Sequence, residues 1–128
     1  MAFATDQDLS TQRAGILSYL PKGQNTWEPQ RNRAEERMLR HLEERWYRPE
    51  AARRGVDWRK QAIDPARLRP EQIKRLAVLY SLEEIYEFLM KDCPEPDGFA
   101  RHRALYQEAA AEELERLLLA GLAYDWDD

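Results

Sequence analysis

The chain has 128 residues, a mass of 15.2 kDa and a formal net charge of -4, which indicates one domain whose core needs neither disulfides nor a structural metal. Val, Ile and Thr together number nine, whereas Ala, Leu, Glu and Arg make up almost half of the chain. This composition favours helices and nearly excludes a β-sandwich, a barrel or a parallel-sheet enzyme. With one cysteine, no secretory leader pattern and no long apolar run, we expect a soluble intracellular protein without a membrane segment.

The first half of the chain predicts two helices and an irregular connection. A first helix is expected over residues 6–19, capped by Thr5 or Asp6. A second is expected from Thr26, its N-cap, to about Trp46, with apolar residues at a spacing of four. Pro49 and Gly55 interrupt the next segment, for which the sequence predicts at most one helical turn.

The second half predicts a short turn over residues 64–68 and two long helices. The helix over residues 70–91 has apolar residues on more than one face and should be central, and the helix over residues 98–119 ends before Gly121. We therefore predict an all-α fold: a single-domain bundle of four main helices over residues 1–121 with a short extra helix or turn, followed by an extended, acidic and aromatic C-terminal arm over residues 122–128.

The sequence offers little catalytic chemistry. His41 has Glu44 three residues on, but a four-helix carboxylate metal site requires Glu-x-x-His runs, and the chain has none. Cys93 lies beside Asp92 near a helix C-terminus, which disfavours a thiolate. No phosphate-binding loop or nucleophile elbow occurs. We therefore predict no catalytic, cofactor or metal site, and a protein that is not an enzyme.

A basic segment is the first candidate interaction site. Residues 31–75 contain 14 Lys or Arg and 8 Asp or Glu. This surface could face DNA or an acidic protein; alternatively, it is a solvated helix face with pairs such as Glu36–Arg40. The basic interface or channel candidates are Arg31, Arg33, Arg37, Arg40, Arg53 and Arg54.

The C-terminal arm is the second candidate. Trp is favoured as an interface anchor, so we expect an acidic aromatic arm to bind a neighbouring subunit or a partner. The alternative is that Trp126 folds back onto its own bundle. The partner-binding candidates are Tyr124, Asp125, Trp126, Asp127 and Asp128.

Several segments resemble the head–tail connector, or adaptor, proteins of tailed bacteriophages and prophages. The segments that carry the resemblance are Thr5–Leu9, Tyr19–Pro21, Arg33–Glu36, Leu76–Tyr86, Tyr106–Ala109, Glu113–Leu114 and Gly121–Asp127. The resemblance implies a homo-oligomeric ring, dodecameric if it follows the family, in the neck of a virion made in the bacterial cytoplasm. Such a ring joins the portal protein to other neck or tail proteins, and DNA passes through it non-specifically. In the family the C-terminal arm commonly extends to the portal.

The charge distribution agrees with self-association. Residues 1–80 have a net charge of +5 and residues 81–128 a net charge of -9, a polarity suited to contacts between the basic part of one copy and the acidic part of the next. The alternative hypothesis is a nucleic-acid-binding or regulatory helical protein that uses residues 31–75.

Overall fold

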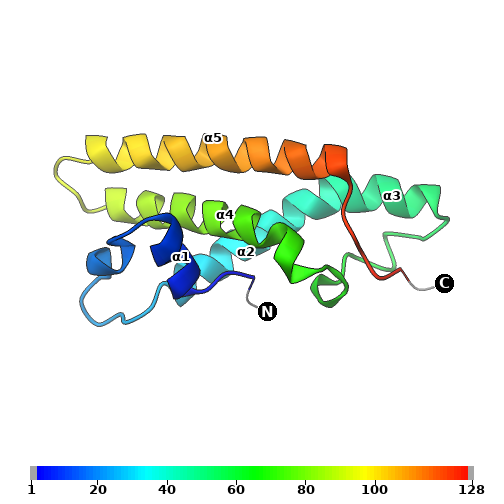
Figure 1. Cartoon of the computed structure of the whole chain (residues 1–128), viewed down its shortest axis with the longest axis horizontal. Coiled ribbons are helices and arrows are strands. Elements are labelled where there is room, and N and C mark those ends of the chain that lie inside the picture. The colour runs from blue at the N-terminus through cyan, green and yellow to red at the C-terminus, as the bar shows by residue number, and fades with distance from the viewer. Residues whose placement is uncertain (1–2, 127–128) are drawn as a thin grey trace.

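The computed structural model describes residues 3–126, and its secondary structure is helical (Figure 1). The elements are α1 (Asp6–Gln12), the 3-10 helix η1 (Ile16–Tyr19), α2 (Glu28–Leu42), the π-helix η2 (Glu43–Tyr47), α3 (Arg48–Arg53), the 3-10 helix η3 (Pro65–Arg67), α4 (Pro70–Met90) and α5 (Asp97–Ala120). Across residues 3–126 the only β-type pairing is an isolated antiparallel bridge between Leu68 and Tyr124. The prediction of an all-α fold is confirmed.

The first helix is shorter than the sequence predicts. It begins with a capping box, in which the Thr5 hydroxyl accepts from the Asp8 backbone N–H and the Asp8 carboxylate accepts from the Thr5 N–H. It ends at Gln12 rather than continuing to residue 19, because Arg13 is already extended, with a φ of -135° and a ψ of 96°, and Gly15 then turns the chain with a φ of 84°. The chain resumes as the 3-10 turn η1, which buries Ile16.

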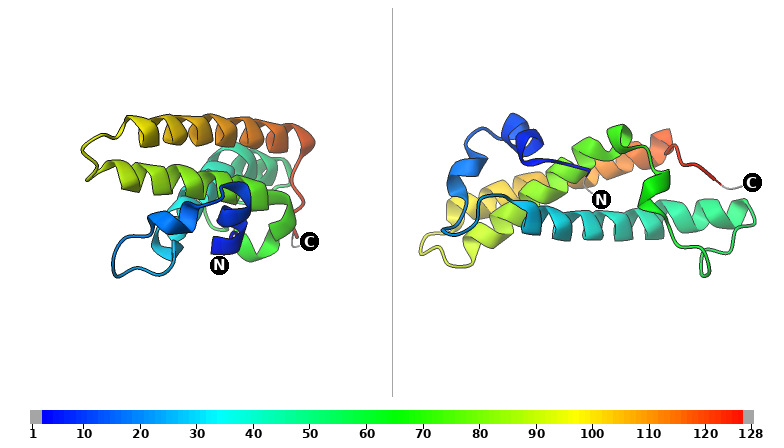
Figure 2. Two further views of the ribbon diagram at one scale, coloured as in Figure 1. Left: turned by 60° about the vertical axis from the view of Figure 1, so that its left-hand side comes forward. Right: turned by 90° about the horizontal axis from the view of Figure 1, so that it is seen from below.

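The second helix is longer than predicted and runs through Pro49. Proline lacks the N–H for the bond to residue i−4, and its ring collides with that carbonyl group in a regular helix. Here the turn before it is a π-helix, in which the Arg48 N–H bonds to the Glu43 carbonyl five residues back. The wider turn accommodates the proline ring, so α2, η2 and α3 form one continuous rod, which the right-hand view of Figure 2 shows lengthwise.

Helix α4 is the centre of the fold, as its sequence predicts. It packs against α2 on one side and antiparallel to α5 on another, and α1 also contacts it (Figures 1 and 2). Eleven of its residues are buried, on more than one face. The centre therefore consists of three long helices, the α2–α3 rod, α4 and α5, with the seven-residue α1 packed on α4.

A buried ion pair ties the N-terminal segment to the start of α2. Arg31 is 8% exposed, and its Nε lies 3.1 Å from the Asp6 carboxylate. The same carboxylate accepts from the Thr26 hydroxyl at 2.6 Å and from the Trp27 backbone N–H at 3.2 Å. Asp6 therefore organises the N-terminus of α2, although Thr26 was expected to be the N-cap and Trp27 occupies that position.

Replacing Asp6 by Ala should lower the free energy of unfolding by about 2–3 kcal/mol, because Arg31 would keep a buried charge without its partner. Urea denaturation measures this loss. Glu28→Ala is the matched control, because Glu28 is an exposed acid in the first turn of α2. Equal losses in the two variants would contradict the assignment.

Candidate functional site

The C-terminal arm leaves α5 at Gly121 and lies at the end of the molecule where α5 and the rod end. Gly121 has a φ of 83° and a ψ of 153°, a conformation nearly restricted to glycine, and it directs the chain away from the helix axis. Residues 122–126 then run past the α2–α3 rod and the segment before α4 (Figure 1). Asp127 and Asp128, two of the partner-binding candidates, lie outside the described residues.

The two aromatic residues of the arm pack against the rod. The Trp126 ring stacks on Tyr47 with centroids 5.5 Å apart and planes 6° apart, and it lies 6.0 Å from the Trp46 ring. Tyr124 meets both Trp46 and Tyr47 edge-on at 5.6 Å. The Arg54 guanidinium lies 4.8 Å from the centroid of the Trp126 ring, a cation–π contact.

Backbone groups of the arm form hydrogen bonds with the surface beneath them, as the backbone of a bound peptide does. The Gln72 side-chain amide donates to the Ala123 carbonyl at 2.7 Å and accepts from the Ala123 N–H at 2.9 Å. The Asp125 N–H donates to the Arg67 carbonyl at 3.0 Å, and the Tyr124 hydroxyl accepts from the Asp64 N–H at 3.0 Å. We call the receiving surface the arm cradle; it consists of Trp46, Tyr47, Arg54, Asp64, Arg67 and Gln72.

This arrangement is the fold-back alternative for Trp126 rather than a free, extended arm. In the described chain, Tyr124 and Trp126 are half-buried and Asp125 is exposed. Docking of the arm on a neighbouring subunit or on a portal therefore stays a prediction, and it requires that the arm leave contacts already made. Sequence reasoning did not identify Gln72, whose role depends on a contact 51 residues away in the chain.

Two arginines of the predicted basic surface have partners inside the fold. Arg31 is buried against Asp6 and also donates to the Ala4 carbonyl at 2.8 Å. Arg37 is half-buried and binds both carboxylate oxygens of Glu83, at 2.9 and 3.5 Å. Both side chains have internal partners, because their positions on α2 turn toward neighbouring elements, which a helical count of charges does not reveal.

The other four arginines of the predicted surface are exposed. Arg33 and Arg40 lie on the outer face of α2 and form no ion pair with a described residue; the expected Glu36–Arg40 pair is not among those found over residues 3–126. Arg53 and Arg54 both pair with Glu50 at the end of the rod, Arg54 at 3.4 Å. The exposed arginines therefore form two separate pairs: Arg33 and Arg40 on the outer face of α2, and Arg53 and Arg54 at the end of the rod.

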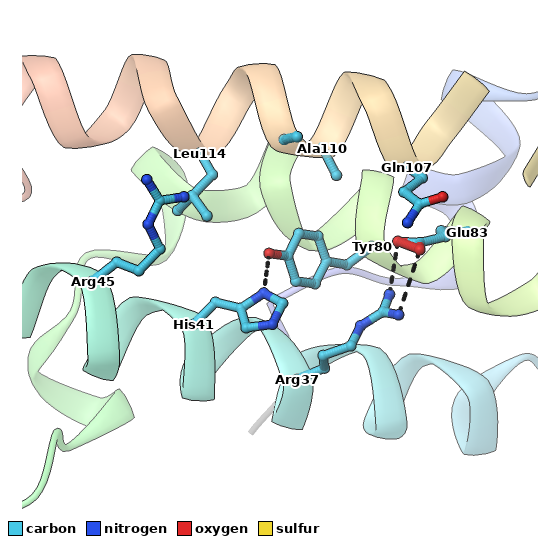
Figure 3. A pocket seen from close by; sticks show the side chains of 9 residues that line it. Arg37, His41, Arg45, Tyr80, Glu83, Gln107, Ala110 and Leu114 are labelled. Atoms are coloured by element: carbon cyan, nitrogen blue, oxygen red, sulfur yellow. Dashed lines mark hydrogen bonds and ion pairs between the residues drawn. The ribbon is translucent and has the colours of Figure 1, made fainter. Parts of the chain in front are cut away.

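A polar groove lies between α2, α4 and α5, with a volume of about 390 Å³ (Figure 3). Its walls consist of Arg37, His41, Arg45, Tyr80, Glu83, Gln107, Ala110, Ala111 and Leu114. Arg37, His41 and Arg45 recur at a spacing of four along α2 and η2, so they lie on one face of the rod. Small side chains at positions 110 and 111 of α5 leave the space open. Polar residues at a spacing of four opposite small residues are the sequence signal that could have predicted this groove.

Polar contacts cross the groove along its length. The Tyr80 hydroxyl lies 2.6 Å from His41 Nδ1, at the centre of Figure 3. At one end of the groove Arg37 pairs with Glu83, and beyond His41 along the rod, Arg45 of η2 pairs with Glu115 of α5 at 2.5 Å. The groove therefore holds opposite charges that neutralise one another, around a shared hydrogen bond between an imidazole and a phenol.

Burial sets the protonation of the central pair. It lowers the pKa of His41 below 6.5, and the neighbouring Arg37 lowers it further. It raises the pKa of the Tyr80 hydroxyl above 10.0, a rise that the charge of Arg37 opposes. Both groups are thus held neutral near pH 7. Burial also raises the pKa of Glu83, with Arg37 acting in the opposite direction.

These groups do not assemble into a metal or thiol site. Residues 3–126 contain no cluster of three His, Cys, Asp or Glu side chains placed to hold a metal ion. The half-buried Cys93 thiol donates to the Glu95 carbonyl at 3.3 Å, remote from His41 in the fold. The arrangement is suited to holding helices together and to binding polar groups.

Comparison of the chain with protein-family models, with curated proteins and with solved structures gives no significant match. None of the helices over residues 3–126 combines the length and the apolar character that crossing a membrane requires. The function must therefore be argued from the arm, the groove and the charged faces.

The lowered pKa of His41 predicts that stability falls on acidification. The folded state resists protonation of His41, so its contribution is complete above about pH 6.5 and is lost as the pH falls below that value. Between pH 7.5 and 5.5 the thermal midpoint of the wild type should fall more than that of His41→Gln, whose amide can still bond to Tyr80. His102→Gln, outside the groove, should behave as the wild type. If the thermal midpoint of His41→Gln fell as much as that of the wild type over this pH range, this account would be contradicted.

The packing of Trp126 predicts that the arm stabilises the isolated chain. Trp126→Ala should reduce the free energy of unfolding by about 1–3 kcal/mol, because it removes the ring that stacks on Tyr47 and exposes the surface beneath. Leu119→Ala is the control, because Leu119 is 89% exposed on α5 and should change stability little. Thermal unfolding followed by circular dichroism measures both. No loss in Trp126→Ala would show that the arm is free in solution.

Proposed function

We propose that this chain is a structural subunit of a phage neck, a head-to-tail adaptor that forms a ring joining the portal to the tail and lining part of the DNA passage. The observation that carries the proposal is the C-terminal arm, which is separated from a helical domain by a glycine turn and held by peptide-like contacts. A detachable arm of this kind is a means of joining subunits. The segments that resemble adaptor proteins supply the particular assembly.

The subunit has an exposed acidic face on α5 and an exposed basic face on α2. On α5, Glu108 and Glu112 are exposed and form no ion pair with any described residue. On α2, Arg33 and Arg40 are exposed and likewise unpaired over residues 3–126. Since these faces are distinct surfaces of one molecule, a contact between α5 of one copy and α2 of the next is heterologous, and repetition of such a contact forms a ring when the rotation between copies closes.

Charge reversal tests this interface. Glu108→Arg combined with Glu112→Arg should abolish assembly, because like charges would face each other across the contact. Adding Arg33→Glu and Arg40→Glu should restore it. Asp92→Arg is the control, because Asp92 is an exposed acid beyond α4 and should leave assembly unchanged. Size-exclusion chromatography with light scattering measures the assembled mass, and full assembly by the double reversal would contradict the interface.

Negative-stain imaging of the purified protein mixed with portal protein tests the function itself. The proposal predicts ring-shaped particles, either of the protein alone or only with the portal. A monomer that persists at every ratio and never joins the portal would overturn it.

One observation favours nucleic acid as a second candidate partner. The end of the rod and the loop after it expose Arg53, Arg54, Arg59 and Lys60, and the Trp58 ring lies 4.5 Å from both the Arg48 and the Arg59 guanidinium. Basic and aromatic side chains together are typical of surfaces that bind nucleic-acid strands. A gel-shift titration at two salt concentrations separates the candidates: tight binding that weakens steeply with salt indicates a nucleic-acid-binding protein, whereas a free adaptor should bind duplex DNA weakly.

A further inference from the structure

We infer that the arm cradle is a peptide-binding site for the arm of a second copy of this chain, and that neighbouring copies exchange arms when they assemble. This inference rests on the proposed function, because it names what occupies the cradle in the ring. The observations that support it are the way the arm is bound, the position of its hinge and the space that remains beside it.

The cradle recognises the arm through contacts that a separate chain could make equally well. The arm is bound by ring stacking on Tyr47, by the paired hydrogen bonds of the Gln72 amide and by the bridge between Leu68 and Tyr124. The residues that make these contacts, Tyr47 and Gln72 of the cradle and the neighbouring Leu68, belong to the rod or to the segment around the start of α4. An arm of identical sequence presented by a neighbour satisfies the same contacts, which is the basis of exchange between identical protomers.

Gly121 is the hinge that makes the exchange possible. Its positive φ redirects the chain immediately after α5, and apart from Gly121 itself, its two neighbours in the chain and the adjoining helix backbone, no heavy atom lies within 4 Å of the position its Cβ would take. A different backbone conformation at this one residue directs the arm elsewhere and leaves α5 intact. Trp126 lies five residues after Gly121, a span of at most roughly 18 Å, so the α5 terminus of the donor copy must lie within about that distance of the acceptor's cradle.

The arm does not fill the cradle. A cavity of about 170 Å³ remains beside Tyr124 and Trp126, bounded by Val56, Gln61 and Ala62 among others. The cradle also carries Arg54 and Arg67: the Arg67 guanidinium donates to the Asp125 backbone carbonyl at 3.2 Å, and the Arg54 guanidinium lies over the Trp126 ring. These contacts favour an aromatic peptide in an extended conformation as the occupant.

The tether explains why an isolated copy keeps its own arm. A short linker gives the arm an effective concentration in the mM range at its own cradle. Free copies at lower concentrations therefore remain closed. Within a ring, a neighbouring arm is present at a comparable effective concentration, and exchange then adds a link between subunits without loss of contacts.

Single-cysteine variants distinguish a copy's own arm from a neighbour's. In a Cys93→Ser background, one variant carries Gln72→Cys in the cradle and another carries Ala123→Cys in the arm. When the two variants are mixed, a short thiol-specific crosslinker joins them only if the arm of the second lies in the cradle of the first. A chain with both cysteines is the control, because as a free monomer it should crosslink within itself and keep the mass of one chain.

We expect no crosslinked dimer from the mixed variants as free monomers and a strong dimer band once they are assembled with portal. Rings that form without that dimer, while the doubly substituted chain still crosslinks internally, would overturn the exchange but leave the adaptor function intact. A crosslink from position 123 to the portal instead would also overturn it, in favour of the portal as the arm's receptor. The absence of any assembly would contradict both proposals. Thermal unfolding of each variant verifies that it is folded.

Discussion

The proline at position 49 is the constraint from which the candidate interaction site follows. A regular helix cannot accept it, and the chain responds with the π-turn Glu43–Tyr47. This turn buries the adjacent residues Trp46 and Tyr47 and allows the rod to continue to Arg53. Without it the rod would end before α3, and the aromatic surface that receives Tyr124 and Trp126 would not exist in this form. π-turns often occur at functional sites, and the position of this one agrees with that tendency.

Charge is used in two distinct ways. In the interior, Asp6 with Arg31 and Glu83 with Arg37 connect elements that lie far apart in the chain. On the outside, exposed charges such as Glu108 and Arg40 form no such pairs with the described residues and are available to partners. The division matters because buried pairs specify how helices pack, whereas exposed ones govern association and its dependence on salt.

Much of the fold could be predicted from the sequence, because it depends on local signals. The apolar pattern of residues 70–91 predicts a central helix, the Asp64–Pro65 pair predicts the turn that follows, and Gly121 predicts the end of α5. Two boundaries could not be predicted, since a proline usually ends a helix and an isolated glycine such as Gly15 is often tolerated in one. In the structure the rod continues through Pro49, because a π-turn precedes the proline, and α1 ends before Gly15, because the backbone is extended at Arg13.

The candidate site was harder to predict, because its contacts are long-range. Gln72 and Ala123, or Tyr80 and His41, meet only after the helices have packed. The sequence identified Trp126 as an anchor but could not show which surface it contacts. It likewise counted Arg31 with the exposed arginines, because helical periodicity alone does not reveal a partner such as Asp6, 25 residues away.

The most direct test of the central claim, that this chain is the repeating subunit of a ring on a portal, is native mass spectrometry of the two proteins together. The account predicts a single complex in which one portal assembly carries a fixed number of copies of the 15.2 kDa chain. Portal and free chain that remain separate at every mixing ratio would contradict it.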